Sequence, residues 1–115
     1  MRLRSDIWVA AYLRRRNAES SVAVLRRRGA AEAGTIFVKI DCLDGRVALY
    51  GPAPQSLLAE LPRGVDRLFQ RMHEPEWIDP VDAEARLARE IRFDPDLWIV
   101  EVEDRDGEPQ IDLAP

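Results

Sequence analysis

Acidic side chains gather between residues 94 and 106, and this stretch is the first place where the sequence could support chemistry. Glu101 and Glu103 are two residues apart, so on a strand they lie on the same face. Together with Asp96 they could bind a hard divalent cation, which prefers carboxylate oxygens. Asp96, Glu101 and Glu103 are therefore a candidate metal site, and a metal-dependent hydrolase is one candidate function.

The motif around this candidate metal site is incomplete. Metal-dependent nucleases carry a lysine in a Pro-Asp…Glu-x-Lys arrangement, but Glu103 occupies the lysine position here. Charged strand residues lie mostly at the surface or in ion pairs. The alternative is that Glu101 and Glu103 form a solvated face, or pair with arginines of a neighbouring strand.

Two runs of three arginines offer a different chemistry, the binding of phosphate groups. Residues 1–28 contain eight arginines against two acidic residues, although the whole chain has a net charge of −4. Guanidinium groups pair bidentately with phosphate, so the two runs could form one basic patch of a nucleic-acid-binding protein. The candidate contacts are Arg14, Arg15, Arg16, Arg26, Arg27 and Arg28.

A structural role for these arginines is favoured over nucleic-acid binding. The isoelectric point near 5.0 is low for a dedicated nucleic-acid binder, and no aromatic residue is interleaved with the arginines. Residues 26–28 could instead lie opposite the acidic residues 101–106 on a neighbouring strand, where opposite charges stabilise the pairing.

The single cysteine and the single histidine narrow the enzyme classes further. Cys42 and His73 are too few ligands for the usual zinc sites. They also make a poor nucleophile–base pair, because the nearby Asp41 and Asp44 raise the pKa of the thiol. No nucleotide-binding glycine motif and no nucleophile elbow is present. The sequence thus contains no recognisable catalytic constellation, and we expect no cofactor.

Three apolar residues outside the clearest elements are candidate partner contacts. Trp77 follows Pro75-Glu76 and precedes Asp79-Pro80, so we expect it to be partly exposed. Leu57 and Leu58 lie in the irregular connection 51–66, and long connections are often functional. All three side chains are equally compatible with covering the core.

Hydrophobic periodicity and turn chemistry predict the elements that position these residues. Glycines at both ends of residues 29–34 predict a hairpin loop, and Asp44-Gly45 predicts a tight hairpin turn. The predicted elements are a helix over 5–16, strands over 21–28, 35–42, 46–50 and 66–73, a helix over 79–92 and a strand over 97–103.

This order predicts an α+β fold. Strands joined by short loops pair antiparallel, so we expect a small, mainly antiparallel sheet of about four to five strands with two helices packed on one face. The 115 residues, 46% of them hydrophobic, suit one domain over residues 1–115, with a polar tail over 108–115 that we expect to be flexible. An edge strand of so small a sheet could pair with a second copy, which makes a homodimer a candidate assembly.

The sequence also carries signals of location. No apolar run approaches the roughly 20 residues that span a membrane, and no signal-peptide pattern follows the basic N-terminus. The one cysteine cannot form an internal disulfide, which fits a reducing compartment. We therefore expect a cytoplasmic protein without membrane contact.

Four blocks of the sequence resemble a family of small bacterial proteins classed as domain of unknown function 1491. They are Ser5–Arg15 (SDIWVAAYLRR), Arg28–Lys39 (RGAAEAGTIFVK), Leu49–Gln55 (LYGPAPQ) and Phe93–Arg105 (FDPDLWIVEVEDR). The resemblance covers nearly the whole chain and implies one domain, but it brings no activity and no site residues. The tail differs from the family pattern, because residues 107–110 (GEPQ) stand where relatives tend to carry basic and aromatic residues.

The function expected from the sequence is that of a small cytoplasmic binding or interaction module without a catalytic site, with a protein as its partner. The alternatives are nucleic-acid binding through the two arginine runs and metal-dependent hydrolysis at the acidic strand. These alternatives differ in where they place the charges, because the first needs arginines that face solvent and the second needs carboxylates that converge.

Overall fold

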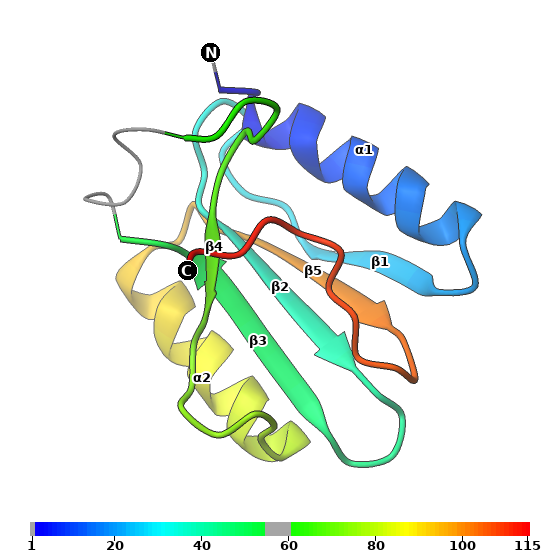
Figure 1. Cartoon of the computed structure of the whole chain (residues 1–115). Helices are drawn as coiled ribbons and strands as arrows, with labels where there is room; N and C mark the ends of the chain where they lie inside the picture. The colour runs from blue at the N-terminus through cyan, green and yellow to red at the C-terminus, as the bar shows by residue number, and fades with distance from the viewer. Residues whose placement is uncertain (1, 55–60) are drawn as a thin grey trace.

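Five strands form one sheet, with a helix on each side of it. The protein is described by a computed structural model over residues 2–54 and 61–115. Its elements are α1 (Ser5–Ala18), β1 (Val22–Arg27), β2 (Ile36–Asp41), β3 (Val47–Pro52), β4 (Phe69–Arg71), α2 (Pro80–Phe93) and β5 (Trp98–Glu103). The strand order in the sheet is β1-β5-β2-β3-β4 (Figure 1).

The pairing of the strands is mainly antiparallel. The β1–β5, β2–β3 and β3–β4 pairs are antiparallel, whereas β2 and β5 run parallel. The predicted α+β class and the mainly antiparallel sheet are therefore confirmed. None of the helices in the described residues is long and apolar enough to cross a membrane.

The predicted hairpin over residues 29–34 is wrong, because β5 lies between β1 and β2. β5 suits this central position: Trp98, Ile99, Val100 and Val102 are all buried, so the strand is apolar on both faces. The loop that joins β1 to β2 therefore passes over the start of β5, where the amide of Ala30 donates to the carbonyl of Asp96 at 2.8 Å.

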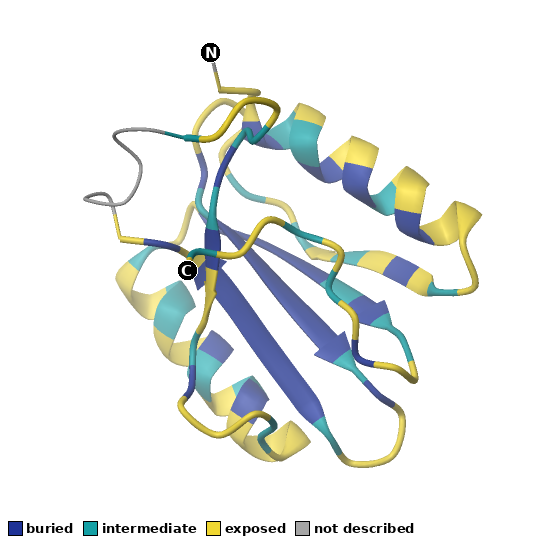
Figure 2. Cartoon of the chain, viewed as in Figure 1, coloured by how far each residue is buried: buried dark blue, intermediate teal, exposed yellow. Residues whose placement is uncertain are grey.

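The two helices cover opposite faces of the sheet, which corrects the expectation that both pack on one face. α1 packs on the face that carries Val38 and Val100, and α2 packs on the face that carries Phe37 and Ile99. Figure 2 shows that the central strands are buried while the outer surfaces of both helices are exposed. Central strands that are apolar on both faces need a cover on each side, and two helices provide it.

The start of α1 is fixed to the loop before β2. The first two helical amides, of Ser5 and Asp6, donate to the carbonyls of Glu32 and Ala31. The Ser5 hydroxyl is buried and donates to the carbonyl of Gly34 at 2.6 Å. These bonds satisfy part of the unpaired backbone at the helix start and set the position of α1 over the sheet.

The C-terminal tail crosses the α1 side of the sheet (Figure 1). Its carbonyls at residues 108, 109 and 110 accept hydrogen bonds from Arg16, Tyr12 and Arg15, respectively. Further on, the amide of Phe69 donates to the carbonyl of Asp112, and the amide of Ala114 donates to the carbonyl of Phe69, each at 2.8 Å. The tail is thus bound to α1 at one end and to β4 at the other.

Candidate binding groove

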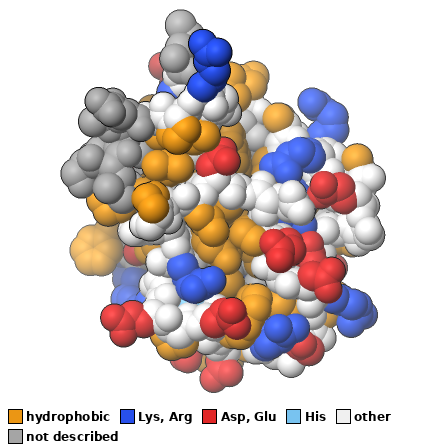
Figure 3. Space-filling view, in the orientation of Figure 1, with side chains coloured by type: hydrophobic (Ala, Val, Ile, Leu, Met, Phe, Trp, Pro, Cys, Tyr) orange, Lys and Arg blue, Asp and Glu red, His pale blue; other side chains and the backbone are white. Residues whose placement is uncertain are grey.

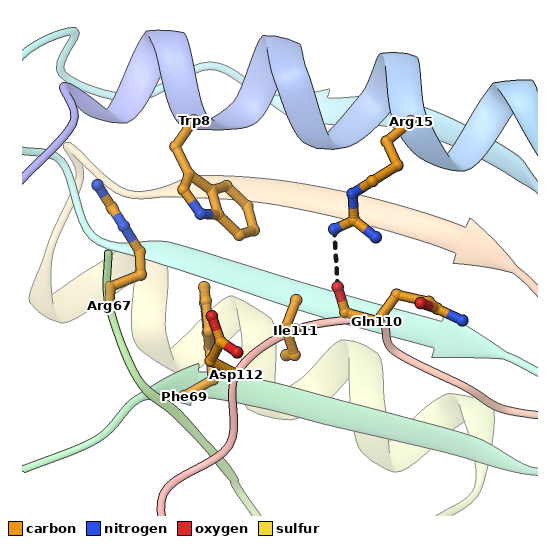
Figure 4. A pocket seen from close by; sticks show the side chains of 7 residues that line it. All are labelled: Trp8, Arg15, Arg67, Phe69, Gln110, Ile111 and Asp112. Carbon is orange, nitrogen blue, oxygen red and sulfur yellow. Dashed lines mark hydrogen bonds between the residues drawn. The ribbon is translucent and has the colours of Figure 1, made fainter. Parts of the chain in front are cut away.

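A groove of about 460 Å³ lies between α1, β4 and the tail. Figure 4 shows side chains from all three segments around it. Figure 3 shows hydrophobic side chains along the middle of this side of the molecule, with charged side chains on either side of them. The residues that line the groove are Trp8, Arg15, Arg67, Phe69, Gln110, Ile111 and Asp112.

Trp8 forms the aromatic wall of the groove. It projects from α1 into the hollow (Figure 4) and stacks on Tyr12, with ring centroids 4.9 Å apart and planes 15° apart. The centre of the Phe69 ring lies 5.3 Å from that of Trp8, with the two planes tilted by 43°. The indole is therefore held rigidly by its neighbours while part of its surface remains accessible, which is the usual arrangement of an aromatic contact residue.

Arg67 closes one end of the groove and is 5% exposed. Its Nε donates to Asp66 at 2.7 Å, and its Nη2 donates to the carbonyl of Leu3 at 2.7 Å. Burial lowers the pKa of Arg67, the hydrogen bond from its guanidinium to Asp66 opposes this, and the positive charge of Arg2 lowers the pKa further. A nearly buried guanidinium thus lies close to a second cation.

Arg15 lies at the opposite end of the groove and is exposed. Its guanidinium carbon lies 5.3 Å from the centre of the Tyr12 ring, and its Nη2 donates to the carbonyl of Gln110 at 2.8 Å. Gln110 has a φ of 54°, a left-handed conformation that is uncommon for residues other than glycine. This turn of the backbone directs the Gln110 carbonyl toward α1 and shapes the tail side of the groove.

Two further hollows adjoin the groove at Arg67. One of about 450 Å³ lies beside the start of α1 and is lined by Arg2, Arg4 and Glu32 among others. The other, of about 150 Å³, lies between Arg2, Arg67 and the start of β2. Because Arg67 lines all three, the hollows are neighbours, and we refer to them together as the concave surface.

The two arginine runs do not form one basic patch. Arg14, Arg15 and Arg16 lie at the end of α1 that leads into the start of β1, whereas Arg26, Arg27 and Arg28 lie at the other end of β1. Most of these side chains bind the protein itself: Arg27 donates to the carbonyl of Pro95, and Arg28 lies over the Trp98 ring at 5.3 Å.

Arg16 is the most deeply buried of the six arginines. Its side chain is 1% exposed and forms an ion pair with Asp104 at 2.6 Å. Arg26 donates to Glu101 at 3.1 Å across the β1–β5 pair, so an arginine of the second run does lie opposite the acidic strand. Because most of these guanidinium groups have partners within the protein, the two runs do not provide one continuous basic surface for a ligand.

The three acidic residues proposed as a metal site do not converge on one point in the described part of the chain. Roughly five residues of extended chain, or about 16 Å, separate Asp96 from Glu101. Glu101 is engaged by Arg26 and lies 3.5 Å from the buried Lys39 Nζ. Across residues 2–54 and 61–115, no three histidine, cysteine or acidic side chains form a group that could hold a metal ion.

Lys39 and Glu84 extend this ion-pair network to α2. Glu84 receives a bidentate hydrogen bond from Arg26, with both distances 2.8 Å, and a further one from Lys39 at 2.7 Å. These hydrogen bonds, chiefly the one from Arg26, lower the pKa of Glu84 to about 2. The network fastens α2 to its face of the sheet.

The remaining sequence candidates lie away from the groove. Trp77 is half-buried, with Arg46 over its ring at 4.9 Å. Cys42 is buried, and burial raises the pKa of its thiol. His73 is buried just after the end of β4, where its Nε2 accepts from the amide of Leu49 in β3 at 3.0 Å. Leu57 and Leu58 lie outside the described residues.

Sequence reasoning did not identify the central residues of the groove. Trp8 was predicted only to lie within the helix over residues 5–16, although its accessible edge forms the groove wall. Arg67 was predicted to lie in a strand, but it precedes β4. Arg67 follows Asp66 and precedes Leu68, and no feature of this local sequence distinguishes it from an exposed arginine, whose charged head normally stays in water.

Comparisons with known proteins agree over the length of the chain. A family model described as "Protein of unknown function (DUF1491)" matches residues 3–112. The crystal structure of a DUF1491 family protein from Caulobacter crescentus CB15 is 32% identical, with a TM-score of 0.78 and 100% of each chain covered. The solution structure of protein Atu0922 from A. tumefaciens is 38% identical, with a TM-score of 0.77 and 100% of this chain and 98% of that chain covered. No curated protein matches.

Proposed function

Because the chain belongs to the DUF1491 family, whose function is unknown, we propose its function from the groove: it is a binding module that holds an extended segment of a partner protein. The observation that carries the proposal is the groove of about 460 Å³ between α1, β4 and the tail. Ligand pockets in proteins commonly have volumes of about 300–1,000 Å³ and combine apolar walls with a few polar groups.

Residues around the groove already bind one extended segment, the C-terminal tail of the protein itself. Tyr12, Arg15 and Arg16 donate to three consecutive carbonyls of the tail, and β4 pairs with the tail around Leu113. The same kinds of group line the unfilled part of the groove, where Trp8 offers a flat apolar surface and Arg15 and Arg67 offer donors. An extended peptide satisfies both, with side chains against the aromatic wall and carbonyls toward the arginines.

The charges favour an acidic segment as the occupant. The concave surface carries Arg2, Arg4, Arg15 and Arg67 against two acidic residues, although the whole protein has a net charge of −4. A positive hollow on a negative protein selects oppositely charged partners and repels others.

The experiment is a selection from a library of random, surface-displayed dodecapeptides with the full-length protein as bait. Enriched sequences should combine an acidic residue with an apolar one. The affinity of an enriched peptide is then measured by calorimetry for the wild type and for Arg15→Glu, which reverses a charge at the groove edge.

Arg14→Glu supplies the matched control, since Arg14 is the preceding residue of α1 and does not line the groove. We expect Arg15→Glu to weaken binding about tenfold or more, a loss of roughly 1.4 kcal/mol, and Arg14→Glu to leave it within about twofold. Equal effects of the two substitutions, or a library that yields no enriched peptide, would contradict the proposal.

A further inference from the structure

The smallest of the three hollows contains a pair of cations that the peptide groove alone does not explain. Arg67 and Arg2 both line this cavity of about 150 Å³, together with the chain from Ala33 to Ile36 and residues Pro52, Leu68 and Phe69. None of its lining residues is acidic. Two arginines therefore line one space whose wall contains no carboxylate.

Hydrogen bonds to the N-terminal segment fix the position of Arg67. Asp66 accepts from the amide of Leu3 at 2.6 Å, while Arg67 donates to the carbonyl of the same residue at 2.7 Å. This two-point contact fixes the extended N-terminal segment, and with it the chain that carries Arg2. The guanidinium is 5% exposed, so the cost of its desolvation is met only in part by Asp66.

The guanidinium retains donors for a ligand. Its Nε and Nη2 donate to Asp66 and Leu3, but its Nη1 donates to no residue in the described part of the chain. Figure 4 shows the Arg67 side chain extending toward the start of α1, away from the tail. The positive charge of Arg2 acts on Arg67 in the direction that lowers the pKa of Arg67, so the two cations repel each other across the space.

We propose that this hollow binds an oxyanion, a carboxylate or a phosphate group, between Arg67 and Arg2. Guanidinium groups bind both anions through charge-assisted hydrogen bonds, and an anion between the two arginines relieves their repulsion. A cavity of about 150 Å³ can hold a molecule as large as benzene, so either a carboxylate or a phosphate group fits in it.

The inference deepens the proposed function and rests on it in one respect. If the groove holds a partner segment, the anion belongs to that segment, as an acidic side chain, a terminal carboxylate or a phosphorylated residue. The groove and the hollow share Arg67 and Phe69, so one extended ligand reaches both.

The test is a titration of the ¹⁵N-labelled full-length protein with sodium acetate and with sodium phosphate, each compared with sodium chloride at equal ionic strength. We expect saturable shifts of the amides of Ala33, Gly34 and Thr35 and of the Arg67 Nε–H signal with at least one oxyanion. A response to acetate alone identifies a carboxylate site, and a response to phosphate alone identifies a phosphate site. Equal shifts with chloride, or no saturation with either anion, overturn the inference.

Two variants assign the effect to the arginine pair. Arg2→Gln removes an exposed cation of the hollow, so the fold should survive, and we expect the anion affinity to fall about fivefold. Arg92→Gln makes the same charge change on α2, on the opposite side of the sheet, and should leave the affinity unchanged. Equal losses in both variants would show a general charge effect and overturn the inference. Peptide binding that persists without any anion response would leave the proposed function standing and remove only this inference.

Discussion

At the scale of single residues, identical side chains two positions apart in α1 have opposite surroundings. Arg14 is exposed, whereas Arg16 is 1% exposed and bonded to Asp104 and to the carbonyl of Glu108. Removing one partner of a buried ion pair leaves an uncompensated charge, while an exposed arginine contributes little. The burial of each arginine, and not its residue type, therefore determines how much it contributes to stability.

Arg16→Ala should lower the free energy of unfolding by about 3–5 kcal/mol, since it leaves Asp104 without its cation. Arg14→Ala should change it by no more than about 0.5 kcal/mol. Urea denaturation of the two variants measures both values. A similar loss in the two variants would contradict the role assigned to the buried pair.

His73 gives the protein a pH-dependent stability. Its Nε2 accepts from the amide of Leu49, so its Nδ1 carries the proton that is donated to the carbonyl of Pro75 at 2.7 Å. Burial chiefly lowers the pKa of His73, the bond to Pro75 opposes this, and Arg71 and Arg86 lower it further. The unfolded chain therefore binds a proton at a higher pH than the folded protein does.

The stability contributed by neutral His73 should be complete above about pH 6.5, the ordinary histidine pKa, and should decrease as the pH falls below it. Chemical denaturation at pH 7.5 and pH 5.5 measures the loss, and His73→Gln should lose less between these two values because it cannot take up the proton. A variant that loses as much stability as the wild type would show that the change arises at other groups.

Some of these residue contacts could be predicted from the sequence. The opposition of Arg26 and Glu101 follows from a basic strand and an acidic strand that gain by pairing, and the structure contains it. The burial of Arg16 could not be predicted, because it depends on Asp104 and on a tail carbonyl about 90 residues away in sequence. For the same reason Arg67 was not predicted as a groove residue, since its partners are the N-terminal segment and α1.

At the scale of elements, the insertion of β5 between β1 and β2 determines the strand order of the sheet. The strands themselves follow from local alternation and were predicted to within a few residues, except that β4 is shorter than expected. Their order does not follow, because residues 29–34 satisfy the turn chemistry of a hairpin equally well. Only the long-range pairing of an apolar strand decides between the two arrangements, and that pairing depends on burial of both of its faces.

The inserted strand leaves no room beside Gly29. A Cβ placed there would collide with the Asp96 carbonyl oxygen and would lie 2.6 Å from the Trp98 ring. Gly29→Ala should therefore destabilise the protein by about 2–3 kcal/mol, as expected for an overpacked site.

Gly45→Asn is the control for Gly29→Ala, because Gly45 has a φ of 95° and open space around it. Asparagine adopts left-handed backbone more readily than most residues, so the expected loss is below about 1 kcal/mol. Thermal or urea unfolding distinguishes the two variants. A harmless Gly29→Ala would contradict the close approach of the crossover loop to β5.

At the scale of the whole molecule, the C-terminal tail connects α1 to β4. It begins beside α1, crosses the face that α1 covers and ends on β4 (Figure 1). The tail is polar and short, so its sequence favours flexibility, and its contacts are made by side chains of α1 that no local pattern connects to it. The groove exists only because this tail, α1 and β4 meet.

Tyr12→Phe tests how strongly the tail depends on α1. The Tyr12 hydroxyl donates to the carbonyl of Pro109 at 2.7 Å, and burial raises the pKa of Tyr12 to about 12, so the hydroxyl keeps its proton at neutral pH. Its loss should cost about 1 kcal/mol. Amide hydrogen exchange should become about fivefold faster at Ala114 and Phe69 and stay unchanged at Val38 in the sheet centre. Unchanged exchange at Ala114 would show that the two ends of the tail are held independently.

The central claim is that the groove between α1, β4 and the tail binds an extended segment of a partner. Chemical-shift mapping of the ¹⁵N-labelled protein with a peptide enriched from the random library tests it most directly. The account predicts saturable shifts at the Trp8 indole, Phe69, Gln110 and Ile111, with little change at Val81 and Leu87 on the opposite face. Shifts concentrated on α2, or spread evenly over the surface, would contradict it.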